Sequence, residues 1–344
     1  MDVEIWDVFA DRPLAGNALA VVHVGGRVAD AAMQRLAREF GFSETVFVRT
    51  GPARAQEPGR PELRIFTPER ELPMAGHPTI GAAFSLDRLG TIDGPRATFT
   101  SGIGPVDLTL ERDEHGGLQR AWMDQGRPRR ETVVSDRPAV AAALGLEPHE
   151  LRAGLPIEAW SAGNPFLLVP LADLEALGRA RLELSALGPW IDADHRAVLA
   201  FVPSDSGPQR CRMFGEALGV VEDPGTGSAH GPLAAYLVRH GLVPFPADGD
   251  GDELESVQGV EMGRPSRLFM RIRPPDTART DRAPDATAPD ATAPDATAPE
   301  LADVRVEVGG RAFLVLEGRL KASLEEASLE QAPLEDASVD EDAS

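Results

Sequence analysis

Two short stretches decide the fold: Ala75-Gly-His-Pro-Thr79 and Pro224-Gly-Thr-Gly-Ser228. Each opens an apolar run of helical length, the first reaching Gly90 and the second Gly241. From Gly76 to Gly225 the offset is 149 residues, and the pair Ala15-Gly-Asn17 and Ala162-Gly-Asn164 repeats at an offset of 147. Two unrelated motifs that repeat at one spacing predict a duplicated domain of about 148 residues. Chance similarity in a Gly- and Ala-rich chain is the alternative.

Both stretches have the chemistry of an anion-binding helix start. The first N–H groups of a helix lack partners inside the helix, and the peptide dipoles place partial positive charge there. Small residues let an anion approach this backbone closely, and Gly76 and the run Gly225, Thr226, Gly227 and Ser228 supply them. We therefore expect these residues to bind substrate, specifically a small carboxylate in a cleft between two lobes.

Four titratable residues stand near these stretches. Glu44 lies between apolar residues in a strand-like run, where partial burial raises the pKa of a carboxyl group and suits it to carry protons. An exposed carboxylate at a strand end is the alternative. Asp223 suits either catalysis or a helix cap, and His77 either catalysis or a structural hydrogen bond. For His230 the structural interpretation is favoured.

The rest of the chain is organised around these motifs. Residues 30–41 predict an amphipathic helix with Asp30 as N-cap and Gly41 past its end. Residues 304–308 and 312–316 predict a hairpin across Gly309-Gly310. The predicted divisions are an N-terminal lobe at 1–118, possible completion of that lobe by C-terminal strands, a C-terminal lobe at 119–274 and 301–321, a disordered Pro-Asp-Ala-Thr repeat linker at 275–300 that interrupts a strand connection, and a disordered acidic tail at 322–344.

Composition excludes several classes of protein. The net charge is −21, but the tail holds eight acidic residues and no basic ones, and the linker adds six acidic and two basic ones. The rest of the chain still carries a net charge of −9, so we do not expect it to bind nucleic acid. Lys321 is the single lysine and stands in no motif, which argues against a pyridoxal-phosphate enzyme. Cys211 is the single cysteine, which excludes an intrachain disulfide and a cysteine-rich metal site. No run suggests a signal peptide or membrane span, so we expect a cytoplasmic protein.

Five ordered motifs together resemble the PhzF family of phenazine biosynthesis, relatives of diaminopimelate epimerase. They are Asp7 to Asn17, Phe42 to Phe47, Ile65 to Thr79, Glu222 to His230 and Gln258 to Ser266. The resemblance covers residues 1 to about 318 apart from the linker. It implies an α+β fold of diaminopimelate epimerase type, with two pseudo-symmetric lobes that each wrap a curled mixed β-sheet around a central α-helix. It also implies a homodimer and isomerase chemistry with no metal and no organic cofactor.

The resemblance assigns roles by position. Glu44 corresponds to the family's acid/base glutamate, and His77, Asp223 and Ser228 to its other active-site groups. Gly76 and Gly227 correspond to backbone that faces the substrate. Diaminopimelate epimerase and its racemase relatives use two cysteines, the first directly before the glycine of the first helix start. Ala75 stands there and no cysteine occurs in the second stretch, so a two-thiol racemase is excluded.

The leading hypothesis is a cofactor-independent isomerase in which Glu44 removes a proton from carbon and returns it elsewhere on the same face. The second is a protein of the same fold that binds or senses a small carboxylate without catalysis. The third, a serine hydrolase, is weaker. The run Gly227-Ser-Ala-His-Gly231 has alanine at the central position where a nucleophile elbow needs serine.

Overall fold

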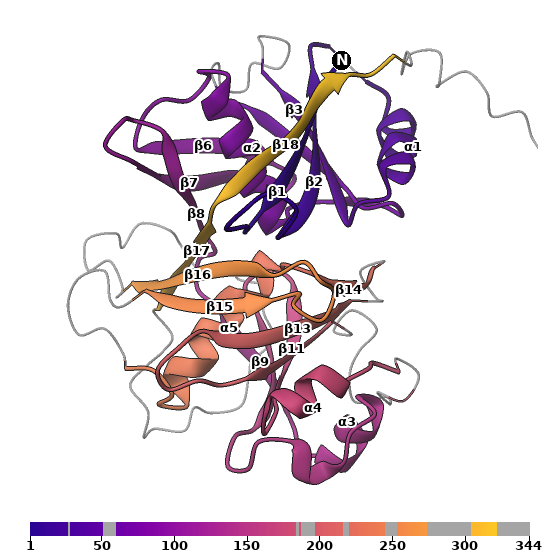
Figure 1. Cartoon of the computed structure of the whole chain (residues 1–344), viewed down its shortest axis with the longest axis vertical. Helices are drawn as coiled ribbons and strands as arrows, with labels where there is room; N and C mark the ends of the chain where they lie inside the picture. The colour runs from indigo at the N-terminus through magenta and orange to yellow at the C-terminus, as the bar shows by residue number, and fades with distance from the viewer. Residues whose placement is uncertain are drawn as a thin grey trace, which may run out of the picture.

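The computed structural model describes residues 1–26, 28–50, 60–183, 186, 197–215, 220–244, 253–273 and 304–321. The predicted linker at 275–300 and the predicted tail at 322–344 lie outside these residues, so their predictions are not tested. Within the described residues the chain forms two lobes, one above the other along the long axis of Figure 1. No helix in this part of the chain is long and apolar enough to cross a membrane.

The chain up to Asp124 forms β1 (Asp2–Val8), β2 (Asn17–Val24), α1 (Asp30–Phe40), β3 (Glu44–Arg49), β4 (Glu62–Phe66), β5 (Glu71–Leu72), α2 (Gly76–Arg88), β6 (Arg96–Ser101), β7 (Gly104–Arg112) and β8 (Leu118–Asp124). The chain from Arg129 forms β9 (Arg129–Val134), α3 (Arg137–Ala143), a 3-10 turn (Pro148–Glu150), β10 (Ile157–Ser161), β11 (Pro165–Pro170), α4 (Leu174–Arg179), β12 (Val198–Val202), β13 (Gln209–Gly215), β14 (Val220–Asp223), α5 (Gly227–Arg239), β15 (Leu254–Gln258), β16 (Ser266–Arg273), β17 (Arg305–Gly310) and β18 (Ala312–Arg319).

The two halves repeat the same arrangement. In each half a parallel strand pair stands among antiparallel ones, β2 with β3 in the first half and β11 with β12 in the second. The central helices α2 and α5 are buried along nearly their whole length, because their sequences are apolar on every side. The core of the first lobe gathers around α2 and a core of the second around α5. The predicted α+β fold of two lobes, each with a curled mixed sheet around a central helix, is confirmed.

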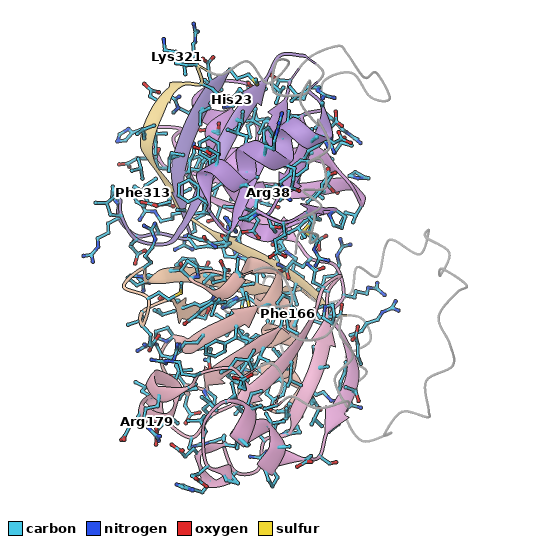
Figure 2. The ribbon with its side chains drawn as sticks, turned by 90° about the vertical axis from the view of Figure 1, so that its right-hand side faces the viewer. His23, Arg38, Phe166, Arg179, Phe313 and Lys321 are labelled. Atoms are coloured by element: carbon cyan, nitrogen blue, oxygen red, sulfur yellow. The ribbon has the colours of Figure 1, made fainter. Side chains whose placement is uncertain are left out.

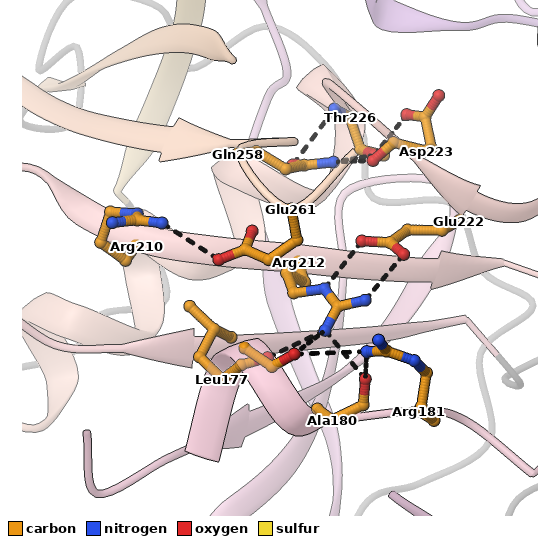
Figure 3. Close-up of polar contacts among 11 residues, drawn as sticks. Leu177, Ala180, Arg181, Arg210, Arg212, Glu222, Asp223, Thr226, Gln258 and Glu261 are labelled. Carbon is orange, nitrogen blue, oxygen red and sulfur yellow. Dashed lines mark hydrogen bonds and ion pairs between the residues drawn. The ribbon is translucent and has the colours of Figure 1, made fainter. Parts of the chain in front are cut away.

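Matched side-chain contacts extend the repeat. The indole of Trp6 donates to Glu4 over 2.7 Å, and the indole of Trp160 donates to Glu158 over the same distance. In the first half Arg64 pairs with Glu71 and stacks on Phe66. In the second half Arg212 pairs with Glu222 and stacks on Phe214; its ion pair is drawn in Figure 3. These pairs support the duplication that the two sequence motifs predicted.

Strands cross between the lobes at the junction. β8 pairs with β7 and with β17, so the two halves share one continuous sheet there. β9 continues from β8 into the second lobe and pairs with β10, while β18 continues from β17 into the first lobe and pairs with β1. Figure 1 shows β18 in yellow along the upper lobe, and Figure 2 shows its Phe313 beside that lobe.

The predicted hairpin across Gly309-Gly310 is wrong. Both glycines lie inside β17, and β18 runs away to β1 instead of folding back. Their small size is needed for packing: a Cβ on Gly309 would lie 2.5 Å from the Trp122 ring, and one on Gly310 would lie 2.5 Å from Phe9. The strands on either side of the linker do pair, β16 with β17.

The amphipathic helix α1 packs Met33, Leu36 and Ala37 onto β3 and β4. Gly41 ends the helix in the left-handed conformation (φ 66°), as predicted. The predicted N-cap is wrong. Ala29 occupies the cap position, and Asp30 is the first helical residue, with its carboxylate 2.5 Å from the Arg64 guanidinium.

Candidate active site

The two helix starts meet at the junction of the lobes. A Cβ on Gly76 would lie 3.2 Å from the Cα of Gly227 and 3.2 Å from the backbone nitrogen of Ser228. A Cβ on Gly227 would lie 3.0 Å from the Phe9 ring. Only glycines allow this approach. It brings the positive ends of α2 and α5 together, so their potentials add where a ligand would lie.

A cavity of about 230 Å³ opens beside the helix starts. Both lobes contribute to its walls, which consist of Ser43, Glu44, Thr67, Arg70, Glu71, Leu72, Pro73, Ala75, Asn164, Met213, Val220, Asp223, Thr226 and Ser228. The walls contain carboxylates, hydroxyls and apolar side chains, the mixture that binds a small polar metabolite. None of the described residues forms a group of three or more His, Cys, Asp and Glu side chains suited to a metal ion.

Glu44 begins β3, beside Leu19 of the parallel neighbour β2. Its side chain is 17% exposed and opens into the cavity, with Oε2 3.5 Å from Nδ1 of His77. That oxygen accepts no hydrogen bond from the described residues. Burial and the negative charge of Asp223 raise the pKa of Glu44, against an opposing hydrogen bond from Ser43. The prediction of partial burial and a raised pKa is confirmed.

His77 is the second residue of α2 and is buried. Burial lowers its pKa to about 3, so the imidazole is neutral at physiological pH. Its Nδ1 faces the amide of Asn17 at 3.3 Å as well as Glu44, while its Nε2 has no partner among the described residues. As an acceptor, Nδ1 suits the Asn17 amide or a protonated Glu44.

Asp223 ends β14, directly before the second helix start. Its two oxygens accept hydrogen bonds from Asn17 Nδ2 at 2.8 Å and from Thr226 Oγ1 at 2.5 Å. Burial raises the pKa of Asp223 although these hydrogen bonds oppose the rise. Gln258 holds the same loop, since its Nε2 donates to the Asp223 carbonyl at 2.6 Å, as Figure 3 shows.

The sequence analysis does not predict Asn17 as a site residue, although the Ala15-Gly-Asn17 motif contains it. Besides Asp223, its amide lies 3.1 Å from the Gly225 carbonyl, and its Oδ1 accepts from Ser43. It thus joins the first lobe to the helix start of the second. The repeat partner of Asn17, Asn164, lines the cavity. The duplicated Ala-Gly-Asn motif is the sequence signal for this residue, but by itself the motif indicates only duplication.

Ser228 lines the cavity at the start of α5, but its hydroxyl has no hydrogen-bond partner among the described residues. His230 does not activate it, because its Nδ1 bonds to the Thr226 carbonyl at 2.8 Å and the ring is fully buried. The structural interpretation of His230 is therefore supported. The pairing of base and nucleophile that a serine hydrolase needs is not formed in the described part of the chain.

Two lobes built around buried helices, with a carboxylate in the cavity beside the paired helix starts, define a protein of the epimerase-like class. Residues 6–287 match the PhzC-PhzF family of phenazine biosynthesis-like proteins. The chain belongs to this family and is an isomerase of it.

Similar proteins, found by sequence and by structure, support this family assignment. The trans-2,3-dihydro-3-hydroxyanthranilate isomerase of Pseudomonas aeruginosa is 40% identical over 273 residues, which cover 77% of this chain and 88% of that protein. A predicted epimerase of the same organism has a similar structure, with a TM-score of 0.70, 34% identity and coverage of 94% and 99%. A PhzF-family protein of Bacillus anthracis has a TM-score of 0.73 at 24% identity, covers 92% and 98%, and is similar in fold.

Proposed function

We propose that this chain moves a proton on a small carboxylate-bearing metabolite, shifting a double bond with Glu44 as acid and base and without a cofactor. One observation carries the proposal. Glu44 opens into the cavity with one oxygen free of hydrogen bonds, beside two helix starts that meet. A proton acceptor and a place for negative charge thus lie together.

The substrate carboxylate lies against the helix starts in this proposal. Free N–H groups near Gly76, Gly227 and Ser228 stabilise the charge that grows when a proton leaves the adjacent carbon framework. Glu44 takes that proton as a carboxylate, and the electron pair moves into the conjugated system. Protonated Glu44 then returns the proton to a different carbon, so the double bond shifts and no atom is gained or lost.

The duplication supports a single proton carrier. The residue that corresponds to Glu44 in the second lobe is Ala197, which precedes β12 and is buried. Asp223 is the acid that the second lobe contributes to the cavity, but both of its oxygens already accept hydrogen bonds. We assign Asp223 and His77 to positioning the substrate and to tuning Glu44. Removal and return of the proton on one face give a double-bond shift and not inversion.

The test follows the proton. Because the P. aeruginosa relative is named for trans-2,3-dihydro-3-hydroxyanthranilate, that compound is the first substrate to assay, in D₂O with mass detection of the product. We expect deuterium in the product, and we expect Glu44→Gln to lower turnover and exchange by about 10²- to 10⁴-fold. Glu39→Gln, an exposed position on α1, is the matched control. Undiminished exchange in Glu44→Gln contradicts the assignment. A substrate that binds tightly without turnover favours the non-catalytic alternative.

A further inference from the structure

Arg70 has a fixed backbone and a free side chain. It closes the turn between β4 and β5, where Thr67 N donates to the Arg70 carbonyl at 2.8 Å and Arg70 N donates to the Thr67 hydroxyl at 3.0 Å. Helix α1 supports this turn, because Gln34 Nε2 donates to the Thr67 carbonyl at 2.8 Å and to the Pro68 carbonyl at 3.0 Å. The position of the Cα is thus held from two sides while the guanidinium extends from it.

The guanidinium of Arg70 is exposed and lines the active-site cavity. Among the described residues that line this cavity, it is the one basic group. It forms no hydrogen bond or ion pair with any residue in the described ranges. A guanidinium binds carboxylates through two parallel, charge-assisted hydrogen bonds. Because the Arg70 guanidinium has no partner in the described part of the protein, it is suited to bind an anionic ligand in the cavity.

No acidic residue that lines the cavity forms an ion pair with Arg70 among the described residues. Glu71, its neighbour in sequence, is held by Arg64, with both carboxylate oxygens bonded at 2.7 and 2.6 Å. Asp223 accepts from Asn17 and Thr226, as described above, and Glu44 faces His77. The positive charge of Arg70 is therefore available to a ligand.

Arg70 differs from the helix starts in exposure. Ala75 and Thr226, which border the helix starts, are 6% and 8% exposed, whereas Arg70 is exposed to solvent. A ligand that fills the cavity thus meets positive potential at its buried end and again at its exposed end. One carboxylate satisfies only one of these two ends.

We propose that Arg70 binds a second carboxylate of the substrate, so that the preferred substrates of this chain are small unsaturated dicarboxylates. This inference rests on the proposed function, in which the first carboxylate lies at the helix starts. Arg70 determines specificity and takes no part in proton transfer. A monocarboxylate binds at the buried end alone, and it leaves Arg70 in water.

The test compares three ring compounds of similar shape by calorimetry: benzoate, isophthalate and 3-carbamoylbenzoate, which replaces the second carboxylate with a neutral amide. We expect the wild-type protein to bind isophthalate about tenfold more tightly than the other two. Arg70→Gln should abolish this preference and leave the affinity for benzoate unchanged. Arg35→Gln, an exposed arginine on α1 outside the cavity, removes the same charge and should keep the preference.

Three results would overturn the inference: equal binding of the three compounds by the wild-type protein, equal weakening of benzoate and isophthalate by Arg70→Gln, or retention of the preference in that variant. Thermal melting checks that Arg70→Gln is folded, which we expect because the Arg70 side chain forms no hydrogen bond or ion pair within the described ranges. The proposed function is tested by a separate experiment. It depends on Glu44→Gln and deuterium exchange, which are measured without these probes.

Discussion

The environment of Glu44 disfavours the ionised form of its carboxyl group. Burial and Asp223 raise its pKa to about 8 from an ordinary value of 4.5. The folded protein therefore holds this proton more tightly than the unfolded chain does. The resulting stabilisation is complete below the ordinary pKa and is lost as the pH rises through the raised one.

Glu44→Gln should therefore become more stable relative to wild type as the pH rises, because glutamine keeps the neutral form at every pH. Between about pH 5 and pH 8 we expect the difference in free energy of unfolding to grow by about 2–4 kcal/mol in favour of the variant. Urea denaturation at both pH values measures it, with Glu39→Gln, at an exposed position on α1, as the control. A difference that stays constant over this range would mean that Glu44 titrates normally.

At the residue scale the sequence predicted the environment of Glu44 well, because apolar neighbours on a strand imply burial. It did not reveal Asn17 or Arg70 as site residues. Asn17 acts on Asp223 across 206 positions of the chain, and such a contact exists only after the lobes meet. Arg70 is distinguished by the partners it lacks, which no sequence pattern displays. The catalytic and binding roles of Glu44 and of the other site residues stay predictions.

At the scale of elements, the helix starts could be predicted because two matched stretches of glycine and small residues each precede an apolar run of helical length. The N-cap of α1 was not predicted, since Ala29 takes the cap position and Asp30 pairs with Arg64. The hairpin failed for a related reason. Paired glycines are ambiguous between a turn and a close approach, and Trp122 and Phe9 settle the question from distant parts of the chain.

Gly76→Ala tests the meeting of the helix starts. The added methyl group would lie 3.2 Å from Gly227 Cα, so the helices must move apart by a few tenths of an ångström. We expect a loss of stability of about 1–3 kcal/mol and weaker binding of benzoate. Gly178→Ala in α4 is the matched control, because nothing lies within 4 Å of its Cβ position, and it should be neutral or slightly stabilising. Unchanged binding in Gly76→Ala would show that the close approach is not needed.

At the scale of the whole molecule, the two lobes are joined by exchanged strands. The duplication was predicted from two motifs, and completion of the first lobe by C-terminal strands was named as a possibility. Which strand crosses, β18, was not predicted, because strand partners depend on where the chain crosses the junction. Lobe boundaries near residue 118 stay a proposal, as does the homodimer that the family resemblance implies.

Ending the chain after Arg311 removes β18 and leaves β1 without its outer partner along Asp2–Val8. We expect loss of cooperative unfolding and a tendency to associate through the exposed edge of β1. A chain that ends after Lys321 keeps β18 and is the control. Circular dichroism during heating and light scattering measure both effects. A cooperative, monodisperse protein without β18 would show that β1 does not need this partner.

The position of β18 also bears on the order in which the protein can form as it leaves the ribosome. β1 emerges first, yet the strand that covers its outer edge is not made until residues 312–319 are translated. The strands of the second lobe run from β9 to β17. Its sheet is therefore complete once β17 has been translated. The lobe translated first is therefore the last to be completed, and for most of synthesis it presents an open strand edge to the cell.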